Sequence, residues 1–253
     1  MNQHDKAVLL ADLHKPGDPI VLFNIWDPGS AKAIAEAGAR AIATGSWSVA
    51  AAYGYADGQA LPLDLAIDNI RRIVASVDVP VTLDFEGGYV ESPEGLKANV
   101  ARVIEAGAAG INFEDQIVGG EGLYSVEQQY DRIRAVREAA DEAGVPLFIN
   151  ARTDVFLKSL PGPHTQDHVD EALTRAEAYA ASGASGLFAP GLRDADLIRG
   201  LCKRSPLPVN IMVMPDTPTN SEMAALGVAR ISYGPGPYRK MIEWLKTEAS
   251  AAL

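Results

Sequence analysis

Short apolar runs alternate with longer segments of mixed polarity along the whole chain. The longer segments mix small and charged residues and are typical of helices, and the last stretch, 237–253, predicts a terminal helix. The short runs are almost continuously apolar, which is typical of parallel strands buried on both faces. Eight such runs occur, at 21–26, 41–46, 81–86, 110–115, 147–153, 186–191, 208–213 and 230–234.

Five of the expected helices end in the same way. A glycine that follows the last helical turn takes the left-handed conformation and stops the helix. The glycines in this position are Gly38, Gly107, Gly144, Gly183 and Gly227. The chain thus repeats one unit, a strand followed by a helix and a glycine, before the next strand begins. This repeat predicts a single-domain α/β fold over residues 1–253, a (β/α)8 TIM barrel. A doubly wound sheet is the alternative. The even spacing of eight runs favours the barrel, and no Gly-x-Gly-x-x-Gly follows the first run.

Composition narrows the class of protein. The 253 residues include 33 acidic and 22 basic side chains, a formal net charge of −11. This charge argues against nucleic acid and anionic membranes as partners. A single cysteine, Cys202, excludes an internal disulfide framework and a cysteine-rich metal site. Because there is no apolar run of membrane-spanning length and no signal-peptide pattern near Met1, we expect a cytoplasmic protein.

Carboxylates gather where two neighbouring strands are expected to end. Asp84 and Glu86 lie two residues apart, so in a strand they would project to the same side. Glu114 and Asp115 end the next run in the same way. Like charges this close are tolerated when a cation lies between them or when one of them is protonated. Asp84, Glu86 and Glu114 therefore predict a site for Mg²⁺, which prefers carboxylate oxygens and water.

Other polar groups are expected at the same mouth of the barrel, where the active sites of such folds lie. Arg152 suits a substrate carboxylate or phosphate through its planar fork, although an ion pair with Asp154 or Glu114 is the alternative. The turn at 46–48 would offer N–H groups to an oxyanion, or be an ordinary turn. The full set of candidate substrate-binding residues is Trp26, Ser46, Trp47, Ser48, Arg152 and Asn210.

These motifs resemble the isocitrate lyase/phosphoenolpyruvate mutase superfamily over nearly the whole chain. The carriers of the resemblance are Asn-Ile-Trp-Asp-Pro-Gly-Ser-Ala at 24–31, Gly-Ser-Trp-Ser at 45–48, Asp-Phe-Glu-Gly-Gly-Tyr at 84–89, Glu-Asp at 114–115 and Ala-Arg-Thr-Asp at 151–154. A further match, Tyr-Gly-Tyr-Ala-Asp-Gly at 53–58, is similar to the superfamily's Gly-x-Pro-Asp loop. The resemblance therefore implies that Asp57 is an active-site acid.

The chain departs from the superfamily pattern after the Glu-Asp motif. The carbon–carbon lyases carry a Lys-Lys-Cys-Gly-His loop there, and the mutases carry Lys and Asn. Here residues 116–124 read Gln-Ile-Val-Gly-Gly-Glu-Gly-Leu-Tyr. The resemblance thus implies metal and oxo-acid binding for this chain more strongly than it implies a particular reaction. Glu121 or Tyr124 would replace the missing acid–base if this glycine-flanked loop closes as a lid.

The resemblance implies a Mg²⁺-dependent lyase. It would cleave a carbon–carbon bond, or decarboxylate, in a small 2-oxo or 2-hydroxy acid through a pyruvate-type enolate. Phosphorus–carbon chemistry of the phosphoenolpyruvate mutase type is one alternative, and a non-catalytic barrel that binds an oxo-acid is another. The superfamily also implies a homo-oligomer, a tetramer or dimer, with the last helix exchanged between subunits. Met241 and Trp244 would suit that interface.

Overall fold

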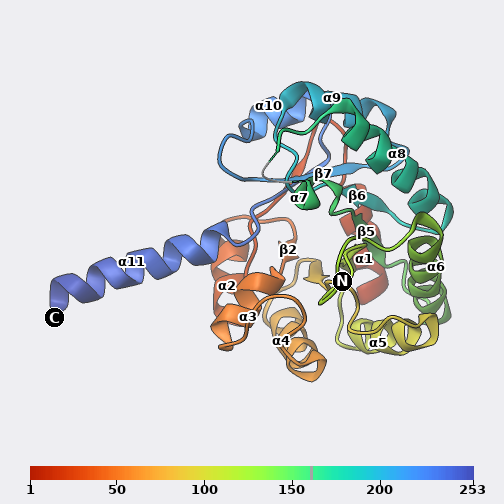
Figure 1. The fold of residues 1–253 in the computed structure, drawn as a ribbon. Coiled ribbons are helices and arrows are strands. Elements are labelled where there is room, and N and C mark those ends of the chain that lie inside the picture. Colours follow the sequence, from red (N-terminus) through yellow and green to blue (C-terminus); the bar gives the residue numbers. More distant parts are fainter. Residues whose placement is uncertain (160–161) are drawn as a thin grey trace.

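Eight parallel strands form a nearly closed barrel with helices around it (Figure 1). The computed structural model describes residues 1–159 and 162–253. Neighbouring strands follow the order β1-β8-β7-β6-β5-β4-β3-β2, and every pairing is parallel. Each predicted run coincides with one strand, although β1 begins one residue before its run. The bounds are β1 Ile20–Leu22, β2 Ile42–Ala43, β3 Val81–Asp84, β4 Gly110–Glu114, β5 Phe148–Arg152, β6 Gly186–Phe188, β7 Val209–Met212 and β8 Arg230–Ser232. The predicted TIM barrel is confirmed.

The helices follow the predicted alternation, with three additions. α1 precedes the first strand, α3 begins in the segment expected to be a turn, and α7 is a single turn after β5. The bounds are α1 Gln3–Asp12, α2 Pro28–Glu36, α3 Ser46–Ala52, α4 Leu63–Ser76, α5 Pro93–Glu105, α6 Val126–Glu142, α7 Val155–Lys158, α8 Gln166–Ala181, α9 Ala195–Arg204, α10 Asn220–Ala225 and α11 Gly236–Ala252.

Local sequence explains where the helices begin and end. All five predicted glycines have a left-handed backbone, for example φ of 96° at Gly38 and 95° at Gly107. At the other end of a helix, the Asp27 carboxylate accepts the N–H of Ser30 at 2.7 Å and caps α2. Each βα unit therefore carries its own stop and start signals, and the apolar faces of helices and strands meet in one large core.

The barrel wall has one thin joint, between β1 and β2. The two strands share no ladder; a single parallel bridge pairs Ile25 with Thr44 just beyond them. The backbone bonds there are Ile25 N–H to Ala43 O at 2.9 Å and Gly45 N–H to Ile25 O at 3.1 Å. The Asn24 amide adds a bond to Thr44 O at 2.8 Å. β4 and β5, in contrast, are in register over five residues each.

α11 projects away from the barrel (Figure 1). Pro237 is its one buried residue, while Trp244 is 61 % and Leu245 51 % exposed. The predicted terminal helix is thus present, and its exchange between subunits stays a prediction. Among the described residues, none of the helices combines the length and apolar character needed to cross a membrane.

Candidate active site

A cavity of about 240 Å³ opens at the carboxyl ends of the strands. Five of the predicted site residues line it, namely Ser46, Trp47, Asp57, Asp84 and Arg152. They come from segments up to about a hundred residues apart and meet because parallel strands bring their carboxyl ends to one rim. The remaining wall is largely apolar and includes Leu157, Phe188, Pro190 and Met212.

Asp84 is the acid at the centre of this cavity. Its Oδ2 accepts two hydrogen bonds from Ser46, one from the backbone N–H at 3.0 Å and one from the hydroxyl at 2.8 Å. Its Oδ1 has only a long contact of 3.5 Å from the Asn112 amide. Ser46 therefore holds Asp84 rather than offering its N–H to a substrate oxyanion, and Asp84 Oδ1 keeps most of its capacity to accept.

Glu86 departs from the expected alternation. The strand ends at Asp84, and Glu86 has a left-handed backbone with φ of 50°. Its carboxylate accepts the Gln59 N–H at 2.8 Å and the Tyr89 hydroxyl at 3.3 Å. Burial, and then the nearby charge of Asp84, raise the pKa of Glu86 to about 7. The charge of Asp84 thus affects the pKa of Glu86, although the Glu86 side chain does not line the cavity with Asp84.

Arg152 is held on two sides by carboxylates. Asp154 accepts its Nε–H at 2.6 Å and an Nη2–H at 2.9 Å, and Glu114 Oε2 lies 2.9 Å from Nη1. Arg152 therefore lines the cavity and also forms the ion pairs of the alternative, and its substrate-binding role stays a prediction. Burial raises the pKa of Glu114, against the opposing effect of the Arg152 charge. Despite the desolvation of the guanidinium, Glu114 and Asp154 hold the pKa of Arg152 above its usual value.

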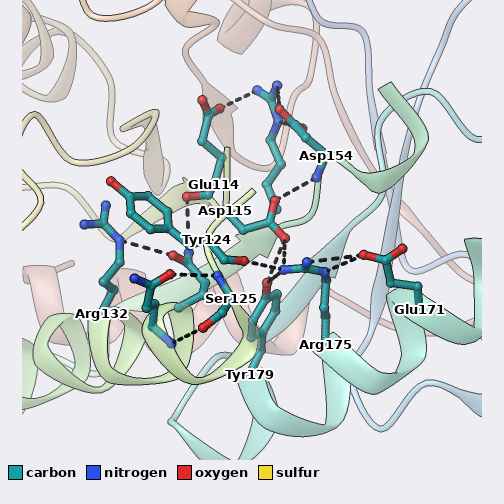
Figure 2. Close-up of polar contacts among 12 residues, drawn as sticks. Glu114, Asp115, Tyr124, Ser125, Arg132, Asp154, Glu171, Arg175 and Tyr179 are labelled. Atoms are coloured by element: carbon teal, nitrogen blue, oxygen red, sulfur yellow. Dashed lines mark hydrogen bonds and ion pairs between the residues drawn. The ribbon is translucent and has the colours of Figure 1, made fainter. Parts of the chain in front are cut away.

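A buried polar network fixes these groups from behind (Figure 2). Asp115 is fully buried; its Oδ1 accepts the backbone N–H of Asp154 at 2.9 Å. Its Oδ2 accepts the Tyr179 hydroxyl at 2.7 Å and the Arg175 guanidinium at 3.2 Å, both from α8. Burial raises the pKa of Asp115, and these donors partly offset the rise. The network positions Asp154 and, through it, Arg152.

Besides Glu86 and Glu114, five predicted residues do not line the cavity. Trp26 packs edge-on against Tyr238, Ser48 is buried, and Asn210 accepts the Ser232 hydroxyl at 3.1 Å. The remaining two lie on the 116–124 loop: Glu121 is exposed, and the Tyr124 ring lies 4.2 Å from the Arg132 guanidinium. A catalytic role for Glu121 or Tyr124 remains a prediction that requires the loop to move.

Several cavity residues were not among the predicted site residues. Asn112 precedes Glu114 by two positions, so the alternation along β4 already places it on the inner side. Asn24 lies within the first apolar run, two residues past β1, and its Oδ1 accepts the N–H groups of Tyr233 and Gly234 at 2.9 and 2.8 Å. Arg239 had no signal in the strand pattern, because it lies in the first turn of α11.

The acids at this mouth do not form a ready-made set of direct metal ligands. Within residues 1–159 and 162–253, no three His, Cys, Asp or Glu side chains gather around one point that suits a metal ion. Glu86 and Glu114 are turned to the partners described above, so the expected three-carboxylate arrangement reduces to Asp84. One carboxylate and several waters still match the coordination of Mg²⁺.

The family model described as phosphoenolpyruvate phosphomutase matches residues 10–253. This chain belongs to the phosphoenolpyruvate phosphomutase family. It is therefore an enzyme of the isocitrate lyase/phosphoenolpyruvate mutase superfamily, as the motifs predicted. A crystal structure from Burkholderia cenocepacia, of a protein provisionally named a phosphonomutase, is 48 % identical, with a TM-score of 0.97 and full coverage of both chains.

Two relatives of this phosphoenolpyruvate phosphomutase family member show how far the likeness extends. An uncharacterized protein of Mycobacterium tuberculosis is 34 % identical over 90 % of this chain and 82 % of its own. The 2-methylisocitrate lyase of Escherichia coli is 28 % identical over 90 % of this chain and 81 % of its own. The chain is thus similar both to a protein named a lyase and to one provisionally named a phosphonomutase.

Proposed function

We propose that this protein is a Mg²⁺-dependent lyase that decarboxylates, or cleaves a carbon–carbon bond in, a small 2-oxo or 2-hydroxy acid. The observation that carries the proposal is that Asp84 and Arg152 line one cavity of about 240 Å³ with Asp57 at its rim. The cavity is smaller than typical sites for drug-sized ligands, which favours a small acid. A cation site and a guanidinium on the wall of one cavity suit a substrate that carries both an oxo group and a carboxylate.

Arg152 would bind the substrate carboxylate. A guanidinium has five N–H donors; Asp154 accepts two of them, and Glu114 lies at ion-pair distance from Nη1. Donors on both η nitrogens therefore remain, and two donors are what a carboxylate accepts in a forked pair. Because the Asp115 network holds Asp154, the guanidinium is oriented before the substrate arrives, and little side-chain entropy is lost on binding.

Asp84 would hold the Mg²⁺ directly, and Glu86 and Glu114 would contact it through water. The fit rests on two observations: Asp84 Oδ1 has only its 3.5 Å contact, and burial together with the charge of Asp84 raises the pKa of both Glu86 and Asp57. A divalent cation would neutralise this excess of negative charge. When bound, it would polarise the oxo oxygen of the substrate and stabilise enolate character.

Asp57 would supply the proton. Desolvation at the cavity edge, followed by the Asp84 charge, raises the pKa of Asp57, so its neutral acid persists to a higher pH than usual. In a decarboxylation the bond to the departing carboxylate breaks, its electrons form the enolate, and Asp57 protonates the enolate carbon. This assignment needs neither the cysteine loop of the lyases nor the lysine of the mutases.

The test measures product formation from four acids with Mg²⁺ present and after its removal by a chelator. Oxaloacetate, isocitrate, 2-methylisocitrate and phosphonopyruvate would be supplied separately, and pyruvate, glyoxylate and phosphoenolpyruvate followed. Asp84→Asn should lower turnover by at least about a hundredfold. Asp78→Asn is the control, since Asp78 is exposed before the opposite end of β3. Pyruvate formation that survives both chelation and Asp84→Asn would refute the proposal.

Phosphorus–carbon chemistry is the second candidate, and the 48 % identity to a protein provisionally named a phosphonomutase favours it. Phosphoenolpyruvate from phosphonopyruvate, without pyruvate from oxaloacetate, would establish it in place of the lyase. If oxalate binds with Mg²⁺ while none of a broad panel of oxo-acids turns over, the third reading applies, a barrel that binds an oxo-acid without catalysis.

A further inference from the structure

Arg230 lies inside the barrel, one step below the floor of the cavity. It precedes Ser232 by two residues on β8, so both side chains face the same side of the strand, and Ser232 lines the cavity. Arg230 is fully buried. Its Nε–H donates to the Ser232 hydroxyl at 3.3 Å, and an Nη2–H donates to Asn112 Oδ1 at 3.1 Å. Among the described residues, Nη1 has no hydrogen-bond partner and the guanidinium has no carboxylate at ion-pair distance.

A buried guanidinium with neutral partners is a poor device for stability. Burial lowers the pKa of Arg230 to about 9, although the charge of Asp84 acts in the opposite direction. The loss of hydration thus outweighs the favourable electrostatics, and an apolar side chain of similar volume would avoid this cost. The contacts of Arg230 lead instead to the site, because both of its partners, Asn112 and Ser232, line the cavity.

Arg230 fixes which way the Asn112 amide faces. Asn112 Oδ1 accepts an Nη2–H of Arg230 and also an Nδ2–H of Asn150, at 2.9 Å. Because a guanidinium can only donate, the atom that it contacts must be the amide oxygen. Asn112 Nδ2 therefore faces the other way, with Asp84 Oδ1 3.5 Å from it. The reverse orientation would set N–H against N–H at Arg230 and oxygen against carboxylate at Asp84.

The amide nitrogen of Asn112 can serve a ligand. Asn112 lines the cavity together with Asp84 and Arg152. Its Nδ2 carries two N–H groups, and the contact with Asp84 uses one of them at a distance that is long for a hydrogen bond. The cavity thus holds an uncharged donor near its central acid, in addition to the cationic donors of Arg152. An oxygen atom of a bound acid is a suitable acceptor for the remaining N–H.

We propose that Arg230 is a positioning residue which, with Asn150, fixes the Asn112 amide so that its nitrogen donates a hydrogen bond to an oxygen of the bound acid. This inference rests on the proposed function, in which the acid lies at Asp84 and Arg152. Arg230 does not touch the ligand and acts through Asn112. Its removal should therefore weaken binding only while the Asn112 amide is present.

The experiment measures oxalate affinity by calorimetry on the full chain with Mg²⁺ present. Oxalate is the probe because it is a small dianion whose oxygens are all acceptors. Asn112→Ala should weaken oxalate binding by roughly tenfold, the effect of one hydrogen bond to a charged group. Arg230→Met should weaken it by roughly threefold or more, since the amide is then free to turn its oxygen to the cavity. Arg230→Lys keeps a donor that cannot accept, and should bind oxalate more tightly than Arg230→Met.

The double variant separates positioning from a structural role. If Arg230 acts through Asn112, Asn112→Ala combined with Arg230→Met should bind oxalate within about twofold of Asn112→Ala alone. Arg137→Met is the matched control. It also removes a largely buried guanidinium that donates to neutral groups, the carbonyl oxygens of Gly183 and Leu147, but Arg137 does not line the cavity or contact a residue that does. Its oxalate affinity should stay within about twofold of the wild type.

Three results would overturn the inference. They are an unchanged affinity in Asn112→Ala, additive losses in the double variant, and an equal loss in Arg137→Met. Each of them leaves the proposed function standing, because the wild type still binds oxalate with Mg²⁺. Failure of the wild type to bind oxalate would instead refute the proposed function and this inference together. If Arg230→Met does not fold, Arg230→Gln replaces it in the same comparison, since a glutamine amide both donates and accepts and so does not fix Asn112.

Discussion

His14, between α1 and β1, should make folding stability depend on pH. The ring is 6 % exposed and stacks on Phe148 with centroids 3.9 Å apart. Its Nδ1 lies 2.7 Å from Leu10 O, and within the described residues Nε2 has no partner. Burial, and then the charge of the fully buried Arg230, lower the pKa of His14 from 6.5 to about 3.

The direction and size of this pH dependence follow from the linkage between proton binding and folding. As pH falls below 6.5, the unfolded chain takes up a proton at His14 that the folded chain refuses until about pH 3. The contribution of His14 is therefore complete above pH 6.5 and is lost as pH falls from 6.5 towards 3. One pKa unit corresponds to about 1.4 kcal/mol, so the loss at pH 5 is about 2 kcal/mol.

The assay is urea unfolding, followed by tryptophan fluorescence at pH 7.5 and pH 5.0, at fixed protein concentration and with a chelator present. His14→Leu is compared with the wild type at each pH. Groups such as Glu86, whose raised pKa changes stability in the opposite direction, are present in both proteins and cancel in the comparison. The stability advantage of the wild type over His14→Leu should shrink by about 2 kcal/mol between pH 7.5 and 5.0.

His4 provides the control, because it is exposed near the start of α1. His4→Leu should change stability by the same amount at both pH values. If the difference between wild type and His14→Leu stays constant within about 0.5 kcal/mol, then the imidazole is not kept neutral by burial and the reasoning fails.

Two further substitutions test the packing around the site. Arg175→Met should lower the free energy of unfolding by about 3 kcal/mol, because it leaves the buried Asp115 carboxylate without its cation. Adding Asp115→Asn should restore part of this loss. If the urea midpoint of the double variant shows no restoration, the pairing of Arg175 with Asp115 is contradicted. Gly88→Ala should destabilise by about 2 kcal/mol or more, since its backbone φ is 84° and the new Cβ would lie 2.4 Å from Leu96 Cδ2. Gly54→Ala is the control, since the backbone φ is 80° there but a new Cβ would meet no atom within 4 Å, and it should cost only about 1 kcal/mol. If Gly54→Ala and Gly88→Ala lower the melting temperature equally, the contact with Leu96 is unimportant.

Most of the fold was predictable from sequence because its signals are local. Apolar runs and glycine stops are read within a few residues, and each of the eight runs coincides with a strand. The helix at Ser46–Ala52 was missed because Gly-Ser-Trp-Ser has turn-like composition, and the acceptor for the N–H of its first residue is Asp84, at the end of β3. Long-range partners of this kind leave no periodic trace.

The candidate site was predictable where a strand carries the residue to the rim, as for Asp84 and Arg152. It was less predictable where the strand stops. The alternation rule assumed that Glu86 continues β3, but the backbone turns at that residue and sends its carboxylate to Gln59 and Tyr89. Arg239 lay outside the pattern altogether, because a helix turn places it against Trp47.

The thin joint between β1 and β2 affects where the barrel opens locally. Local opening costs least where few backbone hydrogen bonds must break, and here those are the two that involve Ile25. Asn24 spans the joint as a clasp, bonded to Thr44 on one side and to Tyr233 and Gly234 on the other. Fluctuations of this clasp would widen the cavity beside Ser46, while Asp115 and its partners on the opposite wall stay fixed. We therefore expect the wall beside Ser46 to open more readily than the wall that orients Arg152.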